Sequence, residues 1–104
     1  MDKHRPTYDL EAFKAVCGEV ETMHVTGVAL RGAAELGFDR DGIAATVRSM
    51  HRHHFYKSMT SYADHRVWQD VYHVPSDAGL LYIKFTADAV TDFLLLSFKE
   101  KDDE

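Results

Sequence analysis

The chain has 104 residues and a formal net charge of −5, with 45% hydrophobic and 28% charged residues. These values are typical of one globular domain, and they exclude a disordered polypeptide, a repeat array and an apolar span of about 20 residues. Cys17 is the only cysteine, so an internal disulfide is excluded. Because the opening residues also lack an apolar secretory segment, a cytoplasmic protein is expected.

The first predicted helix lies near the N-terminus. Apolar residues recur at helical spacing between residues 10 and 20. Thr7 or Asp9 can cap this helix by accepting hydrogen bonds from its free amide groups. The segment 22–26 that follows is short and is compatible with a strand or a loop.

Two further helices are predicted before residue 51. Thr26 can cap a helix that runs through Ala34, and Gly37 would end it in a left-handed conformation. Asp39 or Asp41 can open the next helix, because carboxylates accept from free amides at a helix start. The buried face of that helix is expected to carry Ile43, Ala44, Val47 and Met50.

The second half changes to a period near two, which is typical of strands. Turn residues at 75–79 and the short segment 88–92 can join three of these strands into an antiparallel meander. Helices first and strands afterwards predict an α+β fold, with N-terminal helices on one face of a C-terminal antiparallel sheet. One domain is expected over 1–104, with a frayed acidic tail at 100–104. The predicted strands are 55–62, 66–73, 80–86 and 93–99.

Alternation along the strands separates a core face from an open face. Two apolar sets are assigned to the core: Leu81, Ile83 and Phe85, and Leu94, Leu96 and Phe98. The opposite face carries Gln69, Val71 and His73, then Leu80, Tyr82, Lys84 and Thr86, then Phe93, Leu95, Ser97 and Lys99. Ammonium, phenol and amide groups on one open face could together bind a phosphodiester. The simpler interpretation is that these polar residues are only solvated, as is usual on an open sheet face.

The charge pattern also favours binding of a polyanion. The window 48–69 holds four Lys or Arg and one acid, a local net charge of +3, in a chain that is acidic overall. Local potential matters more than total charge when a polyanion is steered to a surface.

Other chemistries are less well supported. Three histidines and Arg52 lie together at 51–54, but HExxH and CxxC spacings are absent and a cationic helix end is the better interpretation, so no metal site is predicted. Cys17 lies on an apolar stripe, where a buried thiol is inert. The sequence contains no GxSxG, P-loop or GxGxxG motif, so no cofactor is expected.

Several strings resemble the motility quorum-sensing regulator (MqsR) toxin family nearly from end to end. They are Phe55-Tyr56-Lys57-Ser58-Met59-Thr60, Tyr62-Ala63-Asp64-His65, Trp68-Gln69-Asp70-Val71-Tyr72, Tyr82-Ile83-Lys84 and Ser97-Phe98-Lys99-Glu100-Lys101, with Ala34-Glu35-Leu36-Gly37 and Asp41-Gly42 on the helix side. The resemblance implies a RelE-like fold and a sequence-selective endoribonuclease that cleaves mRNA and arrests translation and growth. It also implies a partner antitoxin that contains zinc and binds operator DNA through a helix-turn-helix domain.

The same resemblance implies catalytic roles for Lys57, Gln69, Tyr82 and Lys99. The family pattern has arginine and proline after the tyrosine that corresponds to Tyr72, where this chain has His73-Val74. The phosphate contact of that arginine therefore passes to His73, or to Arg66 or Arg52. Lys84 is a further RNA-binding candidate on the open face.

The predicted reaction is metal-independent cleavage, in which the ribose 2′-hydroxyl attacks the adjacent phosphorus and leaves a 2′,3′-cyclic phosphate. Lys57 and Lys99 would stabilise the developing charge, or one of them would act as base, with His65 and His73 as further candidates. Two alternatives use the same surface: a binding module that acts only through a partner protein, and an interaction domain whose lysines keep it in solution.

Overall fold

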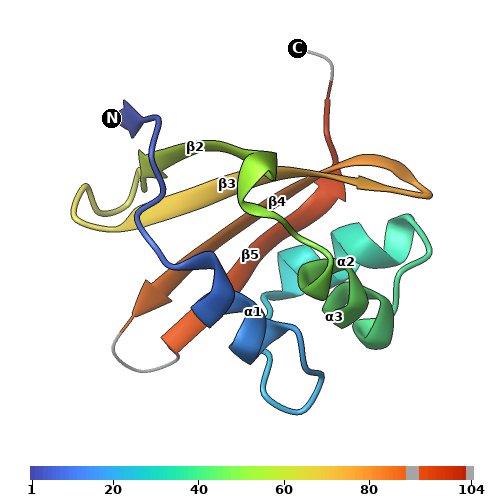
Figure 1. The fold of residues 1–104 in the computed structure, drawn as a ribbon. Helices are drawn as coiled ribbons and strands as arrows, with labels where there is room; N and C mark the ends of the chain where they lie inside the picture. The colour runs from blue at the N-terminus through green and yellow to red at the C-terminus, as the bar shows by residue number, and fades with distance from the viewer. Residues whose placement is uncertain (89–91, 103–104) are drawn as a thin grey trace.

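The computed structural model describes residues 1–88 and 92–102, and it confirms the α+β fold. Its helices lie on one side of a five-stranded antiparallel sheet whose strands run in the order β1-β2-β3-β4-β5 (Figure 1). None of the helices in these two ranges is long and apolar enough to cross a membrane. The elements are β1 Asp2–Lys3, α1 Leu10–Cys17, α2 Gly27–Glu35, α3 Arg40–Arg48, the 3₁₀ helix η1 Arg52–His54, β2 Phe55–Thr60, β3 Trp68–Ser76, β4 Gly79–Asp88 and β5 Asp92–Glu100.

Each of the three α-helices begins at a side-chain cap that was among the candidates predicted from the sequence. Asp9, Thr26 and Asp39 accept hydrogen bonds from the amides of the first turns of α1, α2 and α3. Gly37 has a φ of 88° after α2, in the left-handed region that favours glycine. The first helix is shorter than predicted: it ends at Cys17, and the amide of its C-cap Gly18 makes the last helical hydrogen bond, to the carbonyl of Lys14.

The strand boundaries differ from the prediction by one to three residues, and three of these differences lie in β2 and β3. The second strand ends at Thr60 instead of Tyr62. The third begins at Trp68, since the Arg66 amide and guanidinium both donate to Asp64 and hold residues 64–67 in a turn. The strand β3 then continues through Ser76. The turn predicted at 75–79 is therefore only two residues long and ends before Gly79, whose φ is 98°.

The C-terminal prediction was wrong at its first two residues. Glu100 is the last residue of β5, and the amide of Lys101 donates to the carbonyl of Leu80 at 2.8 Å. The strand β5 and this hydrogen bond extend the ordered sheet into the segment that was predicted to be a frayed tail. Residues 103–104, and 89–91 of the predicted turn between the last two strands, lie outside the described residues.

A bulge in β5 reverses part of the predicted face assignment. Lys84 pairs with Ser97, but its neighbour Phe85 pairs with Leu95, so Leu96 is an extra residue. Leu95 is therefore buried in the core, as is Phe98, whereas Leu94 and Leu96 are half-buried. The prediction that Leu94 and Leu96 belong to the core, with Leu95 opposite, was wrong because one inserted residue shifts the alternation by one position.

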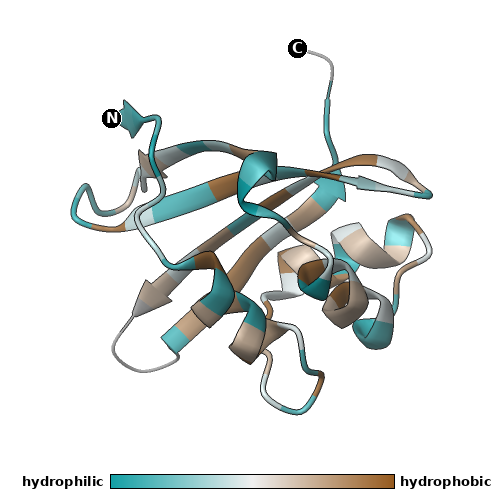
Figure 2. Cartoon of the chain, in the orientation of Figure 1, coloured by the Kyte–Doolittle hydropathy of each residue, from teal (hydrophilic) through white to brown (hydrophobic). Residues whose placement is uncertain are grey.

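The core lies between the helices and the sheet. The rings of Phe13 in α1 and Phe85 in β4 are parallel, with 3.7 Å between centroids, and Phe38 meets Phe98 edge to face. Apolar and hydrophilic segments alternate along the elements (Figure 2). This packing fixes which face of the strands is covered, and so leaves the other face free for chemistry.

A buried carboxylate holds the N-terminal segment against the sheet. Asp70 in β3 is fully buried and accepts hydrogen bonds from the amides of Thr7, at 3.1 Å, and Tyr8, at 2.9 Å. The Thr7 hydroxyl also meets the Ser58 hydroxyl at 2.7 Å. These contacts bring β1 alongside β2. The strand β1 is too short to leave a pattern in the sequence.

We expect Gly32→Ala to destabilise the protein by about 1–3 kcal/mol, because a methyl group there would overpack the contact between α2 and β5. A Cβ at Gly32 would lie 2.3 Å from the carbonyl oxygen of Phe98, which is backbone and cannot move alone. Urea unfolding measures the change. The matched control is Gly27→Ala in the same helix, where the new methyl meets only the flexible end of Arg31. Equal unfolding midpoints for the two variants would contradict the close packing of α2 on β5.

Candidate active site

The open face of the sheet brings candidate residues from four strands into two adjacent rows. In the first row, Lys57 pairs with Val71, Val71 with Lys84, and Lys84 with Ser97. In the second, His73 pairs with Tyr82 and Tyr82 with Lys99. The strand pairing thus gathers residues that are up to 42 positions apart, as Lys57 and Lys99 are.

A hollow of about 340 Å³ lies on this face. Its volume is at the small end of the range for sites that bind small molecules or single nucleotide units. Four of the eight predicted site residues line it, and three lining residues were not among those candidates. The lining consists of Tyr56, Lys57, His73, Tyr82, Lys99, Lys101 and Asp102.

Aromatic rings form part of the lining. Tyr56 stacks on His73 with 4.2 Å between ring centroids and 23° between the ring planes. His73 lies 6.1 Å from the Tyr82 ring on its other side. Three neighbouring rings of this kind offer flat surfaces on which a base can stack.

Two lysines lie over these rings. The Nζ atom of Lys57 is 5.5 Å from the centroid of Tyr56, and that of Lys99 is 5.1 Å from the centroid of Tyr82. Lys57 is also 3.4 Å from the Asp2 carboxylate, which β1 brings to the edge of the sheet. The hollow therefore offers cations beside a tyrosine hydroxyl, and one of these cations already has an acidic partner.

Burial sets the protonation of the two central side chains. It lowers the pKa of His73, and the nearby charge of Lys101 lowers it further. Burial raises the pKa of the Tyr82 hydroxyl, although the Lys57 ammonium opposes this change. Near pH 7, His73 is therefore mainly neutral, and Tyr82 keeps a proton that it can donate.

The other four candidates do not line the hollow. Gln69 lies on the same face opposite Met59, and Lys84 lies in the first row, where burial and then Lys99 lower its pKa. Arg66 is exposed in the loop after β2, with its guanidinium 3.0 Å from the Asp64 carboxylate.

The remaining candidate, Arg52, belongs to η1, and its guanidinium lies 5.2 Å from the centroid of the Phe55 ring. Phe55 packs against Tyr72 at the hydrophobic core, not at the hollow. The structure therefore does not bring Arg52 together with the lysines of the open face.

The imidazole rings of the histidines around Arg52 lie close together. The ring centroids of His51 and His53 are 5.3 Å apart, and those of His53 and His54 are 4.5 Å apart. Burial, followed by the neighbouring His53 and His51, lowers the pKa of His54. Within 1–88 and 92–102, no three His, Cys, Asp or Glu side chains are grouped in a way that could hold a metal ion.

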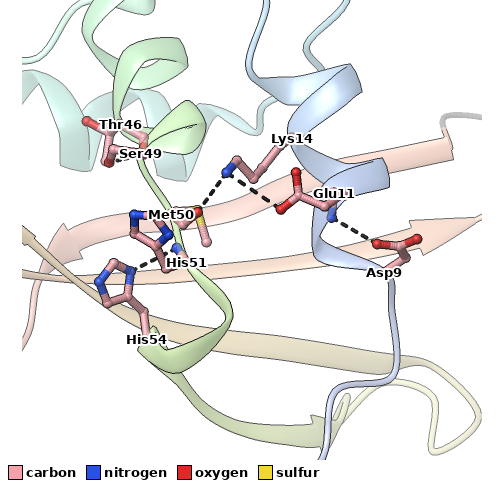
Figure 3. Close-up of polar contacts among 8 residues, drawn as sticks. All are labelled: Asp9, Glu11, Lys14, Thr46, Ser49, Met50, His51 and His54. Carbon is pink, nitrogen blue, oxygen red and sulfur yellow. Dashed lines mark hydrogen bonds and ion pairs between the residues drawn. The ribbon is translucent and has the colours of Figure 1, made fainter.

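Polar contacts on the helix side fix the segment that enters β2 (Figure 3). Lys14 in α1 donates to the carbonyl of Met50 at 2.8 Å and lies 3.7 Å from the Glu11 carboxylate. The His51 amide donates to Nδ1 of His54 at 3.0 Å. These contacts position the turn that places Tyr56 and Lys57 at the start of β2.

Two of the additional lining residues had weak sequence signals. Tyr56 lies at an irregularity between Phe55 and Lys57, so alternation along the strand could not assign its face. Lys101 fell within the predicted frayed tail, although its backbone is hydrogen-bonded to Leu80.

Comparison with known proteins identifies the family of this chain. Residues 5–100 match the family model described as "Motility quorum-sensing regulator, toxin of MqsA". The chain is also 42% identical over 103 residues to the mRNA interferase toxin MqsR of Escherichia coli (strain K12), a match that covers 97% of this chain and all of that protein. The chain therefore belongs to the motility quorum-sensing regulator family of toxins.

Proposed function

We propose that this protein is the toxin of a toxin–antitoxin pair and acts as an mRNA endoribonuclease that arrests translation and growth. The observation that carries the proposal is the hollow, where Lys57, Lys99 and the Tyr82 hydroxyl converge on one side of the sheet. The printed name of the Escherichia coli relative, an mRNA interferase toxin, supports the same activity.

The proposed reaction is an internal transesterification. The ribose 2′-oxygen forms a bond to phosphorus, the bond from phosphorus to the 5′-oxygen breaks, and a 2′,3′-cyclic phosphate and a 5′-hydroxyl remain. Lys57 and Lys99 stabilise the negative charge that grows on the phosphoryl oxygens. Tyr82 donates its proton to the leaving 5′-oxygen and regains one from solvent, and the proton of the 2′-hydroxyl passes to solvent or to the neutral imidazole of His73.

Gln69 and Lys84 extend the proposed site along the open face. The amide of Gln69 can pair with the edge of a base, and the ammonium of Lys84 can contact a neighbouring phosphate. Arg52 and Arg66 would contact more distant parts of a longer RNA, because neither lines the hollow.

Cleavage of a defined mRNA by the purified protein tests this function. We expect cleavage in the presence of EDTA, with 2′,3′-cyclic phosphate ends identified by mass spectrometry. Loss of cleavage on chelation that is restored by a divalent cation would overturn the metal-independent route. Binding without any cleavage would favour the alternative, a module that acts only through a partner protein.

The proposed partner is a cognate antitoxin that binds and silences the toxin in the cytoplasm. We propose that it contains zinc and a helix-turn-helix domain that binds DNA. Co-expression with the product of an adjacent reading frame tests this: we expect a stable complex that contains zinc and lacks RNA cleavage. A complex that retains full cleavage would contradict silencing.

His73 gives a prediction about pH. Because its pKa lies below the ordinary value of about 6.5, we expect its charge to strengthen RNA binding only as the pH falls below about 6.5. His73→Arg should bind more tightly at pH 8 and show less dependence on pH, since a guanidinium stays charged. The measurement is the Kd for a non-cleavable single-stranded RNA between pH 8 and 5.5.

The control is His73→Gln, which removes the imidazole while the other histidines still titrate. The charged or titratable groups that line the hollow with His73 are Tyr56, Lys57, Tyr82, Lys99, Lys101 and Asp102. Identical pH profiles for the wild type and His73→Gln would remove His73 from RNA binding.

A further inference from the structure

Lys101 lies beyond the end of β5 but is not loosely attached. Its amide donates to the carbonyl of Leu80 at 2.8 Å, so the sheet pairing fixes its backbone position. The segment after β5 turns away from the helices (Figure 1), and Lys101 lines the hollow on the open face. Its side chain is half-buried.

Among the residues that the structure describes, Lys101 makes no ion pair with a carboxylate. Its ammonium donates instead to the backbone carbonyl of Asp102, at 3.0 Å. Lys57 differs, because its ammonium lies 3.4 Å from the Asp2 carboxylate. A phosphate that binds Lys57 must compete with that carboxylate, whereas at Lys101 it competes with an exposed neutral carbonyl.

The position of Lys101 relative to His73 is also informative. The two side chains line the same hollow, and the charge of Lys101 contributes to the lowered pKa of His73. An imidazole that is mainly neutral brings little charge to a phosphate at pH 7. The ammonium of Lys101 brings a positive charge to the same hollow.

We propose that Lys101 is a further phosphate-binding residue, which contacts the RNA backbone from the edge of the hollow beside His73. This inference rests on the proposed function, because it assigns Lys101 to the same RNA site. Lys99 and Lys101, two positions apart on one chain segment, approach that site together, and Lys57 approaches it from β2.

The salt dependence of RNA binding tests this assignment. The probe is a short single-stranded RNA that carries 2′-deoxy substitutions and cannot be cleaved. On single strands each neutralised phosphate contributes a slope of about −0.7 to the plot of log K against log salt. We expect Lys101→Gln to bind more weakly than the wild type and to reduce the slope by about 0.7, while Lys101→Arg retains the wild-type slope.

Arg40→Gln is the matched control, because it removes one exposed positive charge from the start of α3, on the helix side. It should bind like the wild type. If Lys101→Gln keeps the wild-type slope, the inference is overturned while the proposed function stands. If the wild type itself does not bind RNA, the proposed function fails and the inference fails with it.

Titration of His73 by NMR in the free protein provides a second readout that does not involve RNA. Removing the Lys101 charge should raise the pKa of His73, and Arg40→Gln should leave it unchanged. An unchanged His73 titration in Lys101→Gln would mean that the ammonium does not lie beside the imidazole, which would overturn the inference.

Discussion

Lys57→Ala is expected to reduce the rate of RNA cleavage by about 10²–10³-fold, the effect of removing one group that stabilises transition-state charge. Lys57 is the residue of β2 that reaches the hollow with a cation, and only 26% of its side chain is exposed. Tyr82→Phe should produce a loss of similar size, because it removes only the hydroxyl that is proposed to donate the proton. Initial cleavage rates on one defined RNA measure both changes.

Arg40→Ala is the control for this pair of variants, because it removes an exposed cation from the helix side of the molecule. Circular dichroism and urea midpoints should show that all three variants fold. If Lys57→Ala and Tyr82→Phe cleave as fast as Arg40→Ala at equal concentrations of folded protein, the active site is not in this hollow.

Local chemistry made the helices of this chain predictable. A cap depends on one side chain and the amides two or three positions later, so Asp9, Thr26 and Asp39 could be named as candidates without knowledge of the fold, with Thr7 and Asp41 as the alternatives to the first and last. The end of α1 was harder, because apolar residues continue to Val20 after the helix has stopped at Cys17. Hydrophobic spacing alone does not show where a backbone turns away.

The faces of the strands were predictable only while alternation was unbroken. Tyr82 and Lys84 were assigned correctly to the open face because β4 alternates regularly to Phe85. In β5, the extra residue Leu96 reverses the faces of the residues that precede it, and nothing in an apolar run marks such a bulge.

Which residues belong to the candidate site depends on contacts between strands that are far apart in the sequence. A window of positive charge grouped Arg52 and Arg66 with Lys57, but the fold places the guanidinium of Arg52 over the Phe55 ring and pairs Arg66 with Asp64. Conversely, Lys101 reaches the hollow through a hydrogen bond to Leu80, which is 21 positions away in the sequence. Such contacts depend on strand register, which local charge does not reveal.

Asp70→Ala is expected to produce the largest loss of stability among the polar substitutions considered, a decrease of about 3 kcal/mol in the free energy of unfolding. The carboxylate is fully buried and accepts from the amides of Thr7 and Tyr8, and hydrogen bonds to charged groups are the stronger kind. Without it, these amides lose their partner in the sheet. Urea unfolding measures the change, and Asp77→Ala, at an exposed turn, should stay within about 0.5 kcal/mol of the wild type.

The same substitution should also affect the proposed active site, through the N-terminal segment. Thr7 and Tyr8 lead back to β1, where Asp2 lies 3.4 Å from the Lys57 ammonium. If Asp70 anchors this segment, Asp70→Ala should expose residues 2–8 to hydrogen exchange under conditions in which β3 and β4 remain protected. Asp70→Asn keeps the shape but loses the charge, so its loss of stability should be intermediate. Equal protection of residues 2–8 in wild type and Asp70→Ala would show that β1 is held by its pairing with β2 alone.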